Sequence, residues 1–350
     1  MILGVESSCD ESALALLDPA SGLCGEWVHS QLDLHREYGG VVPELASREH
    51  LETFPVLLEK VMDKVKGLSA KIEEIAVTCG PGLAPCLALG VSVSRALGIE
   101  LAVPVRAINH LRGHAFSVFI KLHEANPLEF FDSLQTYLPH LGLLVSGGNT
   151  LLFEIRSDLS IQVLAQTVDD AAGEALDKGA KLLGLDYPGG ALLETNALGG
   201  DPTWRDFPRA FAKKPELRFS FSGLKTSLRY LLEKMEDADV DRHFADLCAS
   251  YQAAVVDQLA SKTKQVLSNG QFKSLGLSGG VANNQALRQR ISTLAQSDGC
   301  PLFLAEPSHT GDNAAMIAFA ALVEAHNHKI TYDSQPSIPL LPSLKITQCP

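Results

Sequence analysis

The sequence lacks the marks of a secreted or membrane-bound protein. Its seven cysteines are odd in number and scattered, and none are spaced as Cys-x-x-Cys, which argues against both a disulfide framework and a cysteine zinc site. We find no apolar run near the roughly 20 residues that span a bilayer. No basic segment precedes the first acidic residue, Glu6, as it would in a signal peptide. These absences favour a soluble protein of the reducing cytoplasm.

Positive charge is also scarce. The 350 residues include 29 Lys and Arg against 41 Asp and Glu, a net charge of −12 with neutral histidine. Phosphate contacts dominate the affinity of nucleic-acid-binding proteins, so a protein that binds nucleic acid over its whole surface should be basic. The composition argues against a general nucleic-acid-binding protein. It leaves open a local basic groove, or a partner protein that supplies the phosphate contacts.

The sequence does contain repeated strand–turn–strand patterns in an ordinary globular mixture. Hydrophobic residues make up 46% of the chain, enough for a sizeable core, and the length suits two domains. Apolar runs at 1–5 and 13–17 around a polar turn predict a hairpin, followed by a strand at 25–31, a helix at 43–66 and a strand at 74–78. Runs at 141–145, 151–155, 161–168 and 274–277 repeat the theme, with a helix over 171–183. This alternation predicts two α/β lobes of similar architecture with a cleft between them.

The sharpest cluster of chemically active residues is Asn109-His110-Leu111-Arg112-Gly113-His114. On a helix, His110 and His114 would lie on one face about 6 Å apart along the axis. Two imidazoles reach one metal ion in this way, and neutral imidazole suits iron, zinc or nickel. The alternative is a pair of histidines at a helix start, one capping and one solvated. No His-Glu-x-x-His motif occurs, so a metal site would need a third ligand from elsewhere in the chain.

Three polar or glycine-rich turns follow predicted strands, at residues 6–12, 146–150 and 278–284. Consecutive backbone N–H groups in such turns hold phosphate oxygens, and a following helix adds its partial positive charge. Three turns in similar places favour a nucleotide in the cleft. The phosphate-binding motif GxxxxGK[ST] and the dinucleotide motif GxGxxG are both absent from suitable positions, which argues against those two folds.

Two acidic positions are open to more than one interpretation. Asp10 and Glu11 lie inside the first turn, where paired acids hold a metal, orient water or act as a base, or simply face solvent. The pair Asp312-Asn313 precedes an apolar helix that starts at residue 314. Spacing alone favours a helix cap over a metal ligand there.

An ordered set of motifs is more specific than any spacing. The sequence contains, in this order, VESSCDESALAL, HREYGGVVPELASREH, TCGPGLAPCLALG, INHLRGH, LLVSGGNT, GEALDKGAKLLGLDYPGG, FSFSGLKT, LSGGVANN and HTGDNAAMIAFAA. With these motifs it resembles the TsaD (Gcp) family of bacterial tRNA N6-adenosine threonylcarbamoyltransferases from residue 1 to about residue 325. The departures are small: Asn149 stands where SGGHT is common, Arg112 lies inside the histidine motif, and Gly311 replaces the usual threonine before Asp312.

The resemblance implies the α/β fold of the actin, sugar-kinase and heat-shock-chaperone ATPases, in which two ribonuclease-H-like lobes surround a nucleotide cleft. We therefore expect an N-terminal lobe over residues 1–136 and a C-terminal lobe over 137–310. A helix over 311–328 should lie at the cleft and pack back on the first lobe. The extended tail over 329–350 matches no motif, and we assign it no role.

The resemblance also assigns residues to sites. It implies that His110, His114 and Asp312 bind one divalent metal, Fe²⁺ with Zn²⁺ as the alternative, which makes Asp312 a ligand instead of a cap. The implied substrate-binding residues are Leu144, Val145, Ser146, Gly147, Gly148, Asp177, Gly190 and Asn284. Asp10 and Glu11 are our candidates for proton handling.

The implied reaction transfers the threonylcarbamoyl group from threonylcarbamoyl-AMP to N6 of adenosine 37 in tRNAs that read ANN codons, with release of AMP. The alternative is a small-molecule kinase or carbamoyltransferase of the same fold, but a kinase needs Mg²⁺ on carboxylates and no histidine pair. A non-catalytic dimerisation paralogue is a third class, against which the three metal-binding residues argue. The implied partners are tRNA, threonylcarbamoyl-AMP, a TsaB-like paralogue and a TsaE-like ATPase, with no membrane.

Overall fold

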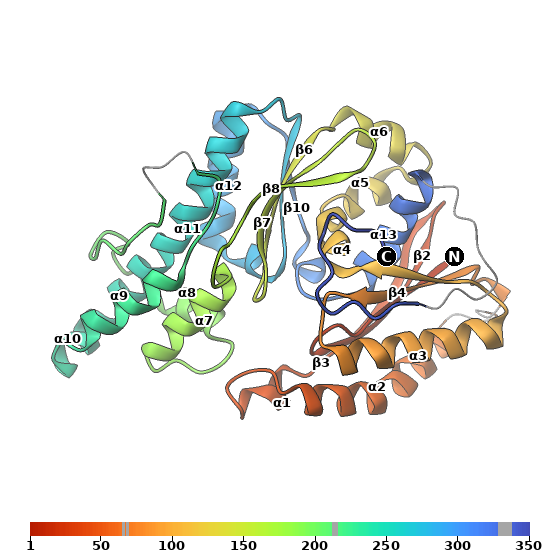
Figure 1. The fold of residues 1–350 in the computed structure, drawn as a ribbon, viewed down its shortest axis with the longest axis horizontal. Coiled ribbons are helices and arrows are strands. Elements are labelled where there is room, and N and C mark those ends of the chain that lie inside the picture. Colours follow the sequence, from red (N-terminus) through yellow and green to blue (C-terminus); the bar gives the residue numbers. More distant parts are fainter. Residues whose placement is uncertain (65–66, 68–69, 212–215, 328–337) are drawn as a thin grey trace. The chain divides into compact units, whose positions relative to one another are not determined.

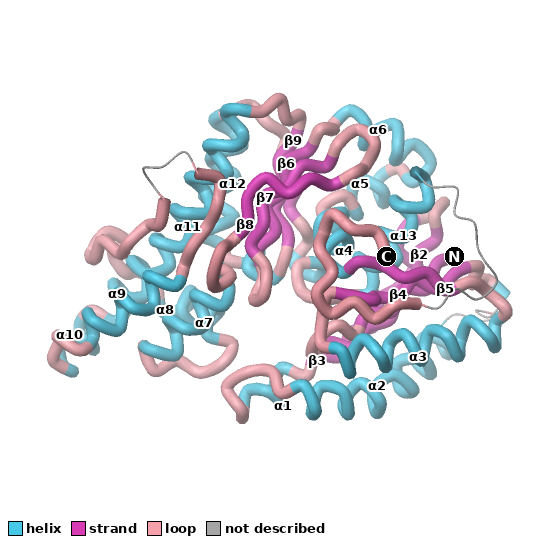
Figure 2. Tube along the Cα trace, viewed as in Figure 1, coloured by secondary structure: helices cyan, strands magenta, loops and turns pink. Residues whose placement is uncertain are grey.

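The computed structural model describes residues 1–64, 67, 70–211, 216–327 and 338–350. The chain divides into two compact units (Figures 1 and 2). Unit 1 comprises Met1–Thr136, Arg156–Ile161 and Ala305–Pro350, and unit 2 comprises Tyr137–Ile155 and Gln162–Leu304.

Unit 1 is built on a five-stranded sheet in the order β3-β2-β1-β4-β5. The strand β2 (Glu11–Asp18) runs antiparallel to both β1 (Ile2–Glu6) and β3 (Gly22–Ser30), which confirms the predicted hairpin. The strands β4 (Glu74–Gly80) and β5 (Val105–Asn109) continue the sheet in parallel with β1. The helices of this unit are α1 (Leu32–Arg36), α2 (Pro43–Lys64), α3 (Ala84–Leu101), α4 (His110–Ser117), α5 (Ile120–Ala125), α6 (Phe130–Thr136) and α13 (Ala314–Asn327).

Side-chain alternation on β2 explains how helices cover both faces of this sheet. Leu14 and Leu16 face the core formed with α2, whereas Ala13 and Ala15 face α13. Successive strand residues point to opposite faces, and the small alanine side chains let α13 lie close to the sheet. The closest approach is at Gly4 of β1, where an added Cβ would lie 2.3 Å from the carbonyl oxygen of Ala314.

Unit 2 repeats the same sheet plan. Its order is β10-β9-β6-β7-β8, with β6 (His140–Val145) antiparallel to β7 (Thr150–Ile155) and parallel to β9 (Ser274–Ser278). The outer strands are β8 (Ile161–Gln166) and β10 (Leu302–Leu304). Its helices are α7 (Ala172–Leu182), α8 (Gly189–Asn196), α9 (Ser222–Leu232), α10 (Asp237–Arg242), α11 (Phe244–Asn269) and α12 (Gln285–Ser297). The order of strands is thus the same in both units, with β6 to β10 in the places of β1 to β5. Each unit combines one mixed sheet with helices, which confirms the predicted α/β class.

The most apolar long helix of unit 1 is α3. The 18-residue helix α3 is long and apolar enough, by length and composition, to cross a membrane. It packs instead against β4 and α2, and Cys86, Leu87 and Val91 of this helix are buried. The buried residues of this helix therefore cover the sheet.

Candidate metal centre

The first part of the site is α4, which begins where β5 ends. Asn109 is the last residue of β5 and the N-cap of α4, and its side-chain oxygen accepts a hydrogen bond from the backbone N–H of Leu111 at 3.0 Å. Every residue of α4 is buried. The predicted helical spacing of His110 and His114 is confirmed, since their rings lie 4.7 Å apart between centroids and nearly perpendicular.

The second part is the segment that leads into α13. Asn313 caps this helix, with its side-chain oxygen accepting from the backbone N–H of Met316 at 2.8 Å. Asp312 is therefore free of the capping role that spacing alone favoured for the pair. The helix α13 packs on α4 at Gly113, where an added Cβ would lie 3.1 Å from side-chain atoms of Met316 and Ile317. This contact brings Asp312 to the histidines from 198 residues along the chain.

Together these elements gather three potential metal ligands. Oδ1 of Asp312 lies 3.1 Å from Nε2 of His114 and 3.3 Å from Nε2 of His110. One ligand atom from each residue lies within 4.8 Å of the others. Nδ1 of His114, the ring nitrogen that does not face Asp312, is buried and has no hydrogen-bond partner among the described residues.

This donor set fits a divalent transition metal. Two imidazole nitrogens and one carboxylate oxygen suit iron or zinc, and three protein ligands leave positions open for a substrate. Among the described residues no other group of three or more His, Cys, Asp or Glu side chains comes together in this way.

A residue that the sequence analysis missed orients His110. Glu6, the last residue of β1, is fully buried, and its Oε2 lies 3.1 Å from Nδ1 of His110. Thr78 and the backbone N–H of Ser8 each donate to the same carboxylate at 2.5 Å. A carboxylate that accepts from one ring nitrogen leaves the other nitrogen for a metal. The available signal was an acidic residue directly after a buried strand.

The electrostatics of the cluster follow from burial and proximity. Burial alone would raise the pKa of Asp312, but His110 and His114 outweigh it and hold that pKa well below its usual range. Burial alone would lower the pKa of His110, but Asp312 and Glu6 raise it well above its usual value. The carboxylates and His110 therefore stabilise each other's charged forms.

The acidic turn with Asp10 and Glu11 lies in the same unit, and the charge of Asp312 acts on it as well. The pKa of Glu11 is raised to about 9, first by burial and then by the charges of Asp312 and Asp10. Ser30 donates a hydrogen bond to Glu11 at 3.2 Å. Asp10 is buried, which excludes the solvated-turn alternative for that residue.

The predicted substrate residues all lie in unit 2. Residues 146–149 form a tight turn after β6, in which the backbone N–H of Ser146 donates to the carbonyl of Asn149 at 2.8 Å. Gly147 and Gly148 are exposed and an added Cβ on either would meet nothing within 4 Å. The structure brings Asp177 and Gly190 together, since the carboxylate accepts from the Gly190 N–H at 2.8 Å. Burial raises the pKa of Asp177.

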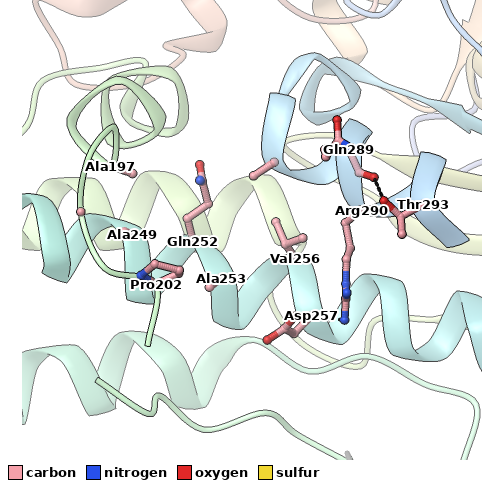
Figure 3. Close-up of a pocket in the computed structure, with 12 residues that line it drawn as sticks. Ala197, Pro202, Ala249, Gln252, Ala253, Val256, Asp257, Gln289, Arg290 and Thr293 are labelled. Atoms are coloured by element: carbon pink, nitrogen blue, oxygen red, sulfur yellow. Dashed lines mark hydrogen bonds and ion pairs between the residues drawn. The ribbon is translucent and has the colours of Figure 1, made fainter. Parts of the chain in front are cut away.

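Asn284 has a separate set of partners. It caps α12 through the backbone N–H of Leu287, and its amide donates to Gln252 at 2.8 Å. Gln252 in turn lines a cavity of about 440 Å³ beside α11 and α12, shown in Figure 3. The sequence analysis did not predict this cavity, because its lining residues come from three separate segments. They are Ala197, Gly200, Pro202, Ala249, Gln252, Ala253, Val256, Asp257, Ala286, Gln289, Arg290 and Thr293.

Comparison with solved structures defines the class of protein. The chain matches component A of (R)-2-hydroxyglutaryl-CoA dehydratase from Acidaminococcus fermentans with a TM-score of 0.52 at 12% identity, over 93% of this chain and 98% of that one. It matches HypF from T. kodakarensis with a TM-score of 0.60 at 14% identity, over 93% of this chain and 48% of that one. At these identities the likeness shows the fold alone, that of the actin, sugar-kinase and heat-shock-chaperone ATPases.

Comparison of sequences is more specific. Residues 22–319 match the TsaD family, described as tRNA N6-adenosine threonylcarbamoyltransferase. A protein of that name from Geotalea uraniireducens (strain Rf4) is 43% identical over 318 residues, which cover 91% of this chain and 89% of that protein. One from Aromatoleum aromaticum (strain EbN1) is 42% identical over 328 residues, covering 93% and 91%. The chain belongs to the TsaD family, which confirms the resemblance drawn from its motifs.

Proposed function

We infer that this protein transfers the threonylcarbamoyl group of threonylcarbamoyl-AMP to N6 of adenosine 37 in tRNAs that read ANN codons. The N6 nitrogen bonds to the carbamoyl carbon, the bond from that carbon to the phosphate oxygen breaks, and AMP leaves with the electron pair. The observation that carries this inference is the convergence of His110, His114 and Asp312 in a chain of the TsaD family. The rival class, a kinase or carbamoyltransferase of small molecules, has no comparable support.

In this proposal His110, His114 and Asp312 hold one divalent metal, Fe²⁺ first and Zn²⁺ as the alternative. When bound, such an ion supplies a Lewis acid that polarises the carbamoyl carbonyl. Glu6 holds His110 in one tautomer, because its carboxylate faces Nδ1. An adenine amine is a poor nucleophile, so positioning and charge stabilisation should contribute more than covalent catalysis.

We further propose that the acidic turn handles the proton that N6 loses. With a pKa of about 9, Glu11 is protonated at neutral pH and cannot accept it. Asp10 is therefore the proposed proton acceptor of the pair, with Glu11 as a hydrogen-bond donor. Burial of Asp10 supports this assignment, since a buried acid is protected from competing solvent.

The adenylate is proposed to bind on the loops of unit 2. The implied residues are Leu144, Val145, Ser146, Gly147, Gly148, Asp177, Gly190 and Asn284. The open glycines of the 146–149 turn support this role, because they let a ligand approach the backbone closely. The Asp177–Gly190 hydrogen bond supports it as well, since it fixes the start of α8.

The partners follow from charge. A chain of net charge −12 has little electrostatic attraction for tRNA, so we propose a cytoplasmic complex in which a TsaB-like paralogue and a TsaE-like ATPase assist. Reconstitution with these partners, tRNA and threonylcarbamoyl-AMP tests the activity, with nucleoside mass spectrometry of adenosine 37 as the measurement. Unmodified adenosine in the complete mixture would contradict the proposed function.

A further inference from the structure

Residues 338–350 lie at the end of the sheet from which α4 starts. In Figure 1 this dark-blue segment runs beside β4 and α4 to the C-terminal mark. The backbone N–H of Leu341 donates to the carbonyl of Cys79 at 2.8 Å, and the N–H of Gly82 donates to the carbonyl of Pro342 at 3.2 Å. At Gly80 the approach is so close that an added Cβ would lie 1.9 Å from the carbonyl oxygen of Leu341. We call residues 341–348 the C-terminal strap.

The strap is a folded turn with its own apolar anchors. Leu344 and Ile346 are buried, at 8% and 2% exposure. The side-chain oxygen of Gln348 accepts from the backbone N–H of Lys345 at 3.0 Å, and the N–H of Gln348 donates to the carbonyl of Lys345 at 2.9 Å. This turn presents the carbonyls of Lys345 and Gln348 in one direction.

Both carbonyls meet Asn109, the cap of the metal-binding helix. Its amide nitrogen donates to Lys345 at 2.8 Å and to Gln348 at 2.9 Å, while its oxygen accepts from Leu111. An asparagine side chain has two donor hydrogens and one acceptor oxygen, so one fully buried side chain joins the strap to the first turn of α4. His110 is the next residue.

We propose that the strap positions α4 for metal binding, with Asn109 as the positioning residue through which it acts. Without the strap, the Asn109 side chain would lose two of its three hydrogen bonds, and only the bond to Leu111 would still hold it against the first turn of α4. The TsaD match covers residues 22–319, so it includes Asn109 but not the strap. The inference rests on the metal-binding role proposed for His110.

The substitution Asn109→Asp tests the contact without removing the cap. An aspartate keeps the oxygen that accepts from Leu111 but replaces the two donor hydrogens with a second oxygen that faces two carbonyls. We expect the Kd for Zn²⁺, measured by competition with a chromophoric chelator, to rise about 10- to 100-fold, as for other residues that orient ligands. Amide exchange at Leu111, measured in the metal-free protein, should accelerate. The matched control is Asn196→Asp, which removes a single 2.8 Å amide-to-carbonyl hydrogen bond within α8.

A second variant covers the case in which Asn109→Asp does not fold. Removal of residues 343–350 deletes both carbonyls that accept from Asn109 and leaves Asn109 itself unchanged, and we expect the same weaker Zn²⁺ binding and faster exchange. Wild-type Zn²⁺ affinity and wild-type exchange at Leu111 in the folded, shortened chain would overturn the proposal. If the intact chain binds no Zn²⁺ or Fe²⁺, the metal-binding role fails, and exchange at Leu111 alone then decides on the strap.

Discussion

His110 has a carboxylate at each of its two ring nitrogens. Glu6 faces Nδ1, and Asp312 faces Nε2. The first contact fixes the ring and the second defines the point to which a metal would bind. At the scale of single residues, the site is therefore a ligand set with its own supporting carboxylate.

Replacement of His110 tests whether this cluster is catalytic or merely structural. We expect His110→Ala to fold, because the core of unit 1 lies elsewhere, and to lose bound metal and most transfer activity. Metal content, thermal melting and adenosine 37 modification should be measured on one preparation, with His29→Ala, a half-exposed histidine paired only with Glu49, as the control. A folded, metal-free His110→Ala protein with full activity would end the catalytic-metal interpretation.

Glu6 allows a finer test of the same centre. Glu6→Gln keeps the shape of the side chain but removes the charge that stabilises His110, so metal affinity should fall about 10- to 100-fold. Chelator competition measures this change. The exposed Glu73, which pairs with the N-terminus, supplies the control substitution Glu73→Gln. Equal metal affinity in wild type and Glu6→Gln would show that the carboxylate does not tune the ligand.

His140 predicts an acid-sensitive stability in unit 2. It is fully buried, bonds Ser274 at 2.6 Å through Nδ1, and has its pKa lowered by burial to about 3. Between pH 6.5 and 3 the unfolded chain binds a proton at this position and the folded chain does not, so the free energy of unfolding falls as pH falls. The loss should reach about 2 kcal/mol between pH 7 and pH 5.

Urea titrations at pH 7, 6 and 5 measure this loss against His140→Gln, in which nothing titrates at that position. The control is His29→Gln, since His29 is half exposed. A wild type whose stability falls in parallel with that of His140→Gln would contradict the assignment.

At the scale of elements, the site depends on how closely α13 lies on the sheet. Gly4 and Gly113 are the positions where β1 and α4 meet this helix, and Asp312 lies two residues before it. A change in the distance between α13 and β1 should therefore move the proposed metal ligand Asp312.

The substitution Gly4→Ala tests this dependence. Its Cβ would lie 2.3 Å from a backbone oxygen, which cannot turn away as a side chain can. We expect a loss of about 1–3 kcal/mol in the free energy of unfolding, as for other overpacked cores, together with weaker metal binding. Gly223→Ala in α9 is the control, since its Cβ would meet nothing within 4 Å. Unchanged metal affinity in Gly4→Ala would show that the position of α13 does not limit the site.

At the scale of the whole molecule, two units share one sheet plan but carry different candidate residues. All three proposed metal ligands belong to unit 1, and all proposed substrate loops belong to unit 2. The shared plan is β3-β2-β1-β4-β5 in one unit and β8-β7-β6-β9-β10 in the other.

The net charge of −12 sets the expectation for tRNA. The isolated chain should bind tRNA weakly at physiological salt, because phosphate contacts need Lys and Arg side chains and this chain has fewer of them than acidic ones. Addition of the paralogue and the ATPase should strengthen binding. Filter binding at several salt concentrations measures both states. Tight binding by the isolated chain at physiological salt would contradict the proposed complex.

The sequence by itself determined the α/β class, the main strands and helices, and the placement of His110 and His114 on one helical face. Each of these depends on residues within a few positions of one another, and the periodicity of apolar residues predicts such local structure directly. The family motifs then implied Asp312, which spacing alone had placed in a cap. The helix α3 shows in addition that a helix that covers a sheet can be as apolar as one that crosses a membrane.

Only the tertiary structure decided which distant groups meet. The pairing of β1 with β4, and of β4 with β5, brings Glu6 to His110, and the packing of α13 on α4 brings Asp312 to His114. The strap carries no motif, and its hydrogen bonds to Asn109 use backbone carbonyls, which every residue has. A pattern of residue types cannot predict a contact made by the backbone, because every residue has a carbonyl and only the folded chain determines where each carbonyl points.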